Sequence, residues 1–346
     1  MGGLFARISP QNLRILGLLG VLILIILFFS TQIPNYLNGR LFNRISSSVA
    51  IMAFIATAQT LVILTRNIDL SIGSIVGFVA FATGSLISNN PDLSPAVLVA
   101  YSMVIGAGFG AINGVLVAYA RIPAIIVTLG TLALFRSALV EFSDAKSITT
   151  SNLPEWLVSF PNTVLFQLGQ FQFRAGFMAA LLVVFLVHLA LTKFRPARKL
   201  YAVGSNPEAA KMAGINTSAV VFITFVLAGV LAGLAGFMFL ARFGTITVVA
   251  GLGLELKSVA ASVVGGVNIF GGSGSVLGAL IGAIMIDLID TSLVRWDLVS
   301  EFWREAVLGT LILISVAVDA IVMRRLIALR VAREKSRTVT AKEATP

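Results

Sequence analysis

The residues of this sequence best placed to do chemistry are ionisable side chains within long apolar stretches. They are Arg136, Glu255, Lys257, Asp287, Asp290 and Asp319, together with the single histidine, His188. A charge facing lipid is costly, so such residues form proton relays or pair with one another. Their positions near the ends of the stretches favour pairing over a midplane relay. Lys257 is matched better with Asp287 than with Glu255, which does not share its helix face.

Nucleophilic and metal chemistry find little support in the sequence. There is no cysteine, and one histidine cannot make a histidine-rich metal site. The nearest approach to a G-x-S-x-G nucleophile motif, residues 271–275, ends in serine and has no histidine close in sequence. A phosphate-binding G-x-x-x-x-G-K-[ST] loop is also missing. We therefore expect a chain that is not an enzyme and does not itself hydrolyse ATP.

The elements that carry these residues are membrane-spanning helices. Hydrophobic residues make up 58% of the 346 and charged residues 12%, and windows of about 18 residues or more are long enough to cross a bilayer as helices. Ten windows are predicted, at 14–31, 47–64, 71–88, 95–119, 123–141, 175–192, 219–241, 250–266, 273–292 and 303–323. The fold class is therefore an all-α polytopic membrane protein. The net charge of +10 suits anionic lipid and not nucleic acid, because no basic soluble face exists.

The distribution of lysine and arginine predicts the orientation in the membrane. Basic residues concentrate on the side that holds the N-terminus, so both termini are expected in the cytoplasm. The polar loop 193–218 then faces the cytoplasm, whereas the loop 142–174 lies outside. The expected organisation is a transmembrane domain over residues 1–326 and a basic, disordered tail over 327–346.

Glycines at four-residue spacing mark helix faces that can pack closely. Small residues one turn apart allow two backbones to approach, which stabilises helix pairs in lipid. The predicted packing residues are Gly106, Gly110, Gly114, Gly274, Gly278 and Gly282.

Two polar breaks, residues 67–74 and 268–275, interrupt the apolar pattern. Irregular backbone at membrane depth can line a transport pathway. The alternative is an ordinary turn in which Asp69 or Ser71 caps one helix and Ser273 caps another. A short match between residues 129–132 and 308–311 hints at inverted halves, spans 2–5 and 7–10.

Several segments together resemble one family. They are residues 64–74 (LTRNIDLSIGS), 113–118 (NGVLVA), 122–131 (IPAIIVTLGT), 201–210 (YAVGSNPEAA) and 264–275 (VGGVNIFGGSGS). The sequence resembles the permease subunit of carbohydrate-uptake ABC importers, the group with ribose, xylose, rhamnose and furanosyl-autoinducer permeases. The resemblance implies a bacterial inner-membrane protein.

The resemblance also implies partners. ATP and magnesium would sit on a separate ATPase subunit, with no cofactor on this chain. Sugar would arrive from an extracytoplasmic binding protein, and a second permease copy or a paralogue would complete the pathway. The coupling segment that contacts the ATPase would include Asn206, Pro207, Glu208, Ala209, Ala210 and Gly214. Asn206 as a cap and Pro207 at the first helical position suit a short rigid helix.

The expected function is import of a monosaccharide, such as a rhamnose-like deoxyhexose or a related sugar. Neutral hydrogen-bonding groups suit a sugar. The polar residues that could line its path are Gln59, Asn67, Asp69, Asn113, Thr128 and Asn268. The alternative is an ion-coupled secondary transporter or channel, which would need an ionisable residue at the midplane.

Overall fold

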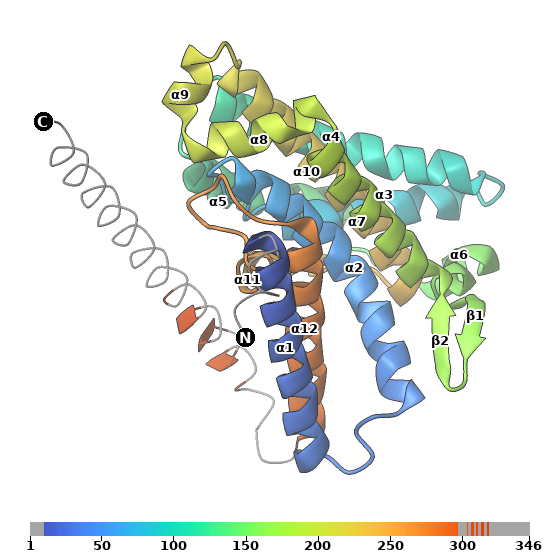
Figure 1. Cartoon of the computed structure of the whole chain (residues 1–346). Helices are drawn as coiled ribbons and strands as arrows, with labels where there is room; N and C mark the ends of the chain where they lie inside the picture. The colour runs from blue at the N-terminus through green and yellow to red at the C-terminus, as the bar shows by residue number, and fades with distance from the viewer. Residues whose placement is uncertain are drawn as a thin grey trace, which may run out of the picture.

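Long apolar helices dominate the structure (Figure 1). It is a computed structural model that describes residues 10–296 and residues 303, 306, 307, 309, 310, 313, 314 and 317. Within these residues eight helices are long and apolar enough to cross a membrane. They are α1 (Pro10–Gln32), α2 (Gly39–Leu64), α3 (Ile72–Asn89), α4 (Pro95–Ala118), α5 (Ala124–Ser143), α7 (Ala175–Lys193), α10 (Thr217–Phe243) and α12 (Val276–Arg295). The expectation of a polytopic helical membrane protein is confirmed.

The eighth predicted window, 250–266, does not form a full span. It contains α11 (Leu254–Val264), whose 11 residues cover about 16 Å at ~1.5 Å per residue, against about 30 Å of hydrocarbon. Gly251 and Gly253 hold positive φ angles before this helix, and Gly266 does so after it. These left-handed positions end the helix at both sides.

Three sequence predictions fall on other parts of the chain. The tenth window, 303–323, is outside the described residues except for the isolated positions named above, and Asp319 and the tail 327–346 lie wholly outside them. Of the second half of the proposed inverted repeat, spans 7–10, only the last span falls outside, together with residues 308 and 311 of the short match. These stay predictions.

The loop predicted to lie outside the membrane contains a small sheet that was not predicted from the sequence. After η2 (Thr150–Asn152), α6 (Glu155–Ser159) and η3 (Phe160–Asn162), the strands β1 (Val164–Leu168) and β2 (Phe171–Arg174) pair as an antiparallel hairpin. The hairpin packs against the start of α2, where the backbone N–H of Gln172 donates to Asn43 Oδ1 at 3.0 Å. Figure 1 shows it beside α6.

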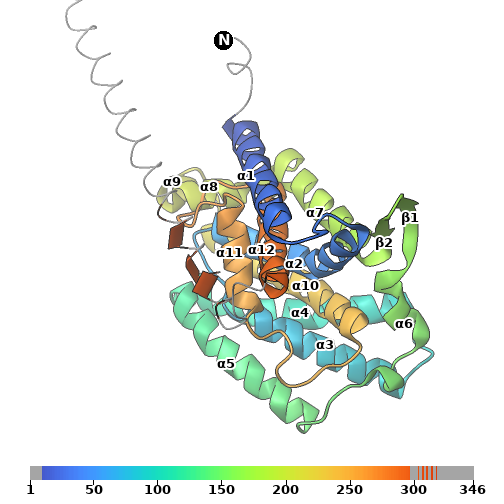
Figure 2. The ribbon, with the colours of Figure 1, turned by 90° about the horizontal axis from the view of Figure 1, so that it is seen from below.

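The centre of the bundle is α2, which is buried over most of its length, whereas α1 lies at the edge and contacts α12. α1 and α12 run side by side in Figures 1 and 2. α10 packs mainly against α4, α2 and α3, and α12 packs against α11 and α2. Figure 2 shows α5 at the periphery. The buried middle of the bundle is thus formed by helices that meet α2.

Glycines lie where helix backbones touch. A Cβ on Gly106 would collide with the carbonyl of Gly229, and a Cβ on Gly229 with that of Gly106, so α4 and α10 are in backbone contact. Gly110 is equally close to Phe225.

The remaining predicted packing glycines divide into two kinds. Gly114 lies against Phe222, Gly278 against Gly265, and Gly282 against Ala261. Gly274 differs, because α12 begins at Val276, and Gly274 sits in the preceding loop with φ +151. Gly274 therefore presents no helix face for packing.

Candidate functional site

The first polar break forms a short non-helical segment between α2 and α3. α2 ends at Leu64 and α3 starts at Ile72. In between, Asp69 accepts hydrogen bonds at Oδ1 from the backbone N–H of Ser71 (2.8 Å) and from its hydroxyl (2.7 Å). The Asp69 carboxylate therefore accepts the hydrogen bonds of the nearby Ser71 N–H and hydroxyl, as in an Asx turn.

Polar side chains from three helices converge on this break. Asn113 of α4 donates through Nδ2 to Ser71 Oγ at 2.8 Å, and Thr128 of α5 donates to the carbonyl of Ile68 at 3.2 Å. Gln59 of α2, with its amide oriented to suit its neighbours, donates to the Asp69 carbonyl at 3.0 Å. We call Gln59, Asp69, Ser71, Asn113 and Thr128 the break cluster. Four of its members were predicted pathway residues, and Ser71, which joins Asp69 to Asn113, was not.

The break cluster is sealed in this conformation. All five residues are buried, and Asp69 is only 1% exposed. Burial raises the pKa of the Asp69 carboxyl above its usual range, against the opposing effect of the hydrogen bonds from Ser71. Among the described residues, Asn113 Oδ1 is a buried acceptor with no hydrogen-bond donor. Asn113 Oδ1 can therefore accept one more hydrogen bond. A donor that reached it would remove the cost of a buried acceptor without a partner.

The other two predicted pathway residues do not join the cluster. Asn67 donates to the carbonyl and the hydroxyl of Thr65, which are two residues away. Asn268 lies in the second break, where its Oδ1 accepts from the backbone N–H of Phe270 at 3.0 Å. Both side chains are used for local turn geometry.

The predicted coupling segment folds into two short helices, α8 (Arg195–Ser205) and α9 (Pro207–Met212), at one end of the molecule (Figure 1). Asn206 Oδ1 caps α9 by accepting from the backbone N–H of Ala209 at 3.0 Å, and Pro207 occupies its first turn beside Glu208. After α9, the Ile215 N–H donates to the carbonyl of Ala210 at 3.0 Å.

The surface of this segment is uneven. Gly214 turns the chain after α9 with φ +78. Ala210 is buried, whereas Met212 is 90% exposed. α9 is therefore a rigid element, stopped at both ends, that presents an apolar side chain outward.

Arg66 ties the coupling segment to the first break. Its Nε donates to the Gly204 carbonyl at 2.5 Å and its Nη2 to the Ser205 carbonyl at 2.6 Å, both at the C-terminal end of α8. A guanidinium suits this position because the last carbonyls of a helix carry partial negative charge. Arg66 itself has φ +65, a left-handed conformation that costs free energy in a non-glycine residue.

The second break joins the same contact. The Gly272 N–H donates to the carbonyl of Leu64 at 3.0 Å, and Tyr201 donates to the carbonyl of Gly274 at 3.1 Å. A Cβ on Gly204 would collide with the Leu64 carbonyl, so α8 is in backbone contact with the end of α2. We call the contact of Arg66, Gly204, Ser205 and Gly272 the joint. No sequence signal pointed to Arg66 as its centre.

A second polar region, made of charges, lies between α10, α11 and α12. Lys257 pairs with Asp290 at 2.9 Å. The expected Lys257–Asp287 pair is therefore wrong, because the rotation of α12 brings Asp290 to the lysine. Asp287 is half-buried and interacts with the charge of Arg242, whose Nη1 also donates to the Ser47 carbonyl at 2.9 Å. We call Arg242, Lys257, Asp287 and Asp290 the charged cluster.

Arg136 and Glu255 are brought near each other. Arg136 of α5 donates to the carbonyls of Val248 (3.1 Å) and Ala250 (2.5 Å), in the irregular segment before α11. The charge of Glu255 acts on Arg136, and Glu255 also accepts from the Gly253 N–H at 3.1 Å. Like the charged cluster, these side chains hold helices and loops together.

Within the described residues, no group of three or more His, Cys, Asp or Glu side chains could hold a metal ion.

Comparison with known proteins places the chain in a family. A family model described as branched-chain amino acid transport system, permease component, matches residues 41–316. The autoinducer 2 import system permease protein LsrC of Yersinia enterocolitica is 37% identical over 279 residues, which is 81% of this chain and 75% of the relative. LsrC of Escherichia coli O9:H4 is 36% identical over 315 residues (90% and 88%), and that of Escherichia coli O157:H7 is 37% identical over 331 residues (95% and 93%). No solved structure gives a significant match.

The family answers several questions that the sequence raised. A permease of this kind is a transport subunit and not an enzyme, and ATP is bound by its partner ATPase. An importer of this class implies an ATPase and a binding protein as partners. Membership also selects ATP-driven import over the ion-coupled alternative. The chain therefore belongs to the branched-chain amino acid and sugar permease family of ABC importers, as a multi-pass inner-membrane subunit.

Proposed function

We propose that this permease imports a small polyhydroxylated sugar of the furanosyl autoinducer 2 type, driven by an ATPase that binds α9. The observation that carries the mechanism is the joint, because it puts the proposed ATPase-binding segment in direct hydrogen-bonded contact with the α2–α3 break. The substrate assignment is supported by the names of relatives at 36–37% identity. A rhamnose-like deoxyhexose is the competing substrate.

In this proposal α9 is the element that the ATPase moves. Its caps make it rigid, and the exposed Met212 provides an apolar contact for a cleft on the ATPase. The coupling residues are Asn206, Pro207, Glu208, Ala209, Ala210 and Gly214. A displacement of α9 moves the end of α8, and Arg66 transmits it to the break. Packed elements with two arrangements convert such small shifts into larger ones.

The break cluster is the proposed sugar-contacting part of the pathway. Gln59, Asn113 and Thr128 offer neutral hydrogen-bonding groups, and Asn113 Oδ1 lacks a donor that a sugar hydroxyl would supply. Because the cluster is buried, opening of the break must precede contact with sugar. Asn67 and Asn268 line the route beside it.

A second permease chain, identical or a paralogue, completes the pathway in this scheme. The binding protein would deliver sugar at the opposite face, where the β1–β2 hairpin and α6 lie. The transmembrane domain accordingly covers residues 1–326, with the coupling loop at 193–218.

Reconstitution tests the substrate. Proteoliposomes with this permease, its ATPase and its binding protein should accumulate labelled autoinducer 2 only with ATP, and excess rhamnose should not compete. If rhamnose competed better than unlabelled autoinducer 2, a rhamnose-like deoxyhexose would be the substrate instead. ATP-independent uptake by the permease alone would overturn the mechanism.

Cross-linking tests the coupling segment. Because the chain has no cysteine, Met212→Cys introduces a single reactive thiol. It should form a disulfide with a cysteine placed in the ATPase cleft, and the bond should abolish uptake until it is reduced. Leu165→Cys, exposed in the hairpin, is the matched control and should not react. Equal reaction at both sites would contradict the proposal.

A further inference from the structure

An elongated apolar groove of about 640 Å³ runs between α7 and α10. Its lining includes Asn216, which caps α10, and then one face of the helix over four turns, at Val220, Ile223, Leu227 and Leu231. The part of α10 along the groove, residues 217–231, is 15 residues long and corresponds to about 22 Å at ~1.5 Å per residue. The groove therefore has the shape of an extended chain, and not of a compact ligand.

One end of the groove is polar and basic. All the residues that line it are apolar except Lys199 of α8 and Asn216 at the start of α10. Arg195 precedes Lys199 by one turn and shares its side of α8. Lys193 and Arg198 are close in sequence and exposed. This end is the one predicted to face the cytoplasm.

These four cations have no acidic partner in the described part of the chain, where Lys193, Arg195, Arg198 and Lys199 form neither an ion pair nor a side-chain hydrogen bond. The N-terminus of α10 adds partial positive charge beside Asn216, which caps it by accepting from the Ala219 N–H at 3.0 Å. The positive charge at the mouth of the groove is therefore available to an external anion.

We propose that this groove is a binding site for an anionic phospholipid of the inner leaflet. One acyl chain lies between α7 and α10, and the phosphate and its anionic headgroup face Lys199 and Arg195. The two features select the ligand together: an apolar channel alone takes any lipid tail, whereas unpaired cations at its inner end favour negative over zwitterionic headgroups. Because α8 forms both the groove end and the joint, the lipid would also steady the coupling segment.

Native mass spectrometry of the purified full-length chain tests the headgroup. Phosphatidylglycerol should remain bound at collision energies that remove phosphatidylcholine. Lys199→Ala should weaken its retention about fivefold, as expected for the loss of one cation near ~1 kcal/mol, and Arg195→Ala with Lys199→Ala should weaken it further. Arg121→Asn removes an exposed inner-side cation outside the groove, in a left-handed position that asparagine tolerates. It should leave retention unchanged.

A photoactivatable phosphatidylglycerol with its reactive group in the acyl chain tests the groove. Cross-links should map to residues 186–200 and 215–231, and Ile223→Trp, which fills the groove, should reduce them. Competition by glycerol phosphate would show that the headgroup binds without the chain and would overturn the site. Equal retention of both lipids, or cross-links spread over α1 and α5, would overturn it as well. None of these outcomes depends on the transported sugar.

Discussion

The break cluster is buried and the charged cluster is half-buried, and their polar groups are of opposite kinds, neutral in the first and charged in the second. Around the α2–α3 break, hydroxyl and amide groups surround one carboxyl, and one amide oxygen has no donor within the described residues. Between α10, α11 and α12, two cations face two carboxylates. Neutral hydrogen bonds exchange partners at a net cost of about 1 kcal/mol each. Buried charges cannot separate without a much larger penalty.

We infer from this difference that the two regions have different roles. A region that must open and meet a sugar benefits from weak, exchangeable contacts. A region that must keep helices in register benefits from contacts that are expensive to break. We therefore expect substitutions in the break cluster to change transport more than folding, and substitutions in the charged cluster to do the reverse.

The largest effect is expected for Asp287→Leu. Removal of this carboxylate leaves the half-buried Arg242 without its partner charge, and the loss of one partner of a buried ion pair destabilises a protein by up to about 3–5 kcal/mol. Denaturation in mild detergent should show this loss, while uptake per folded molecule stays near normal. Tyr101→Phe is a control for a substitution outside both clusters. A stable Asp287→Leu protein that no longer transports would reverse the assignment of roles.

Arg66→Ala should come next. It removes two hydrogen bonds to the end of α8, and we expect ATP-driven uptake to fall about tenfold, a change of ~1.4 kcal/mol in the barrier. Binding of the ATPase, measured by co-purification, should persist because α9 keeps its own caps. Arg66→Lys keeps the charge and should recover only part of the rate, because lysine cannot form both bonds in the guanidinium geometry. Loss of ATPase binding would instead place Arg66 in the docking surface.

Asn113→Leu should have a smaller and more selective effect. It removes the donor to Ser71 and the buried acceptor that lacks a donor, so the change in folding stability should be about 1 kcal/mol or less. If Asn113 meets the sugar, KM for uptake should rise about fivefold, whereas kcat should change little. Unchanged KM would remove Asn113 from the pathway.

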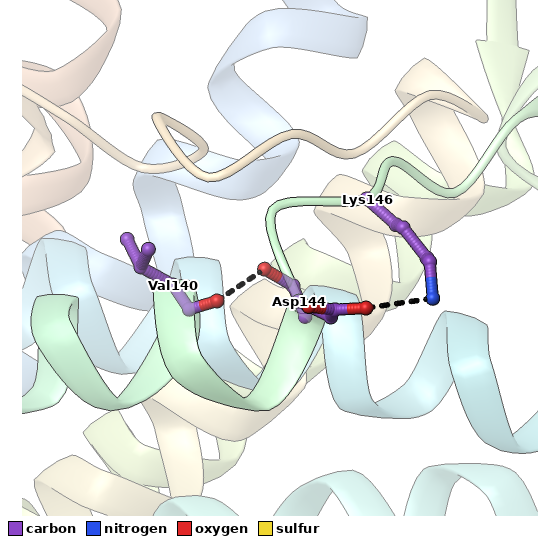
Figure 3. Close-up of polar contacts among 4 residues, drawn as sticks. Val140, Asp144 and Lys146 are labelled. Atoms are coloured by element: carbon purple, nitrogen blue, oxygen red, sulfur yellow. Dashed lines mark hydrogen bonds and ion pairs between the residues drawn. The ribbon is translucent and has the colours of Figure 1, made fainter.

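The smallest effect is expected at the end of α5, where Asp144 and Lys146 form an exposed ion pair at 2.8 Å (Figure 3). Lys146 lowers the pKa of Asp144, so any stabilisation is present above the ordinary pKa of aspartate and is lost as pH falls through the lowered value. Solvent screens such pairs. Lys146→Ala should leave the melting temperature unchanged at every pH, and a clear decrease would show that surface charges matter here too.

The spans were predictable because long apolar windows leave few alternatives in a membrane, and the break at 67–74 was visible because Asn67, Asp69 and two serines interrupt such a window. The length of α11 was overestimated, since apolar composition continues through Gly253 and Gly266, whose left-handed backbone ends the helix on its two sides. The hairpin had a usable signal in Gly169, which lies between two short runs rich in Phe and Leu.

The site was predictable only in part. Residue types pointed to Gln59, Asp69, Asn113 and Thr128, but partner choice depends on helix rotation, which windows do not encode. Lys257 was therefore assigned to the wrong aspartate. Arg66 contacts residues 138 and 139 positions away in sequence, and no local pattern predicts such a contact.

That separation along the chain has a consequence for biogenesis. The carbonyls that receive Arg66 are synthesised well over a hundred residues after it, and Gly272, which closes the same contact, appears later still. Until then the guanidinium has no permanent acceptors. The joint is therefore completed late in membrane insertion, and a chain truncated before residue 272 would contain the sequence of α1 to α11 but lack the Gly272 hydrogen bond to Leu64.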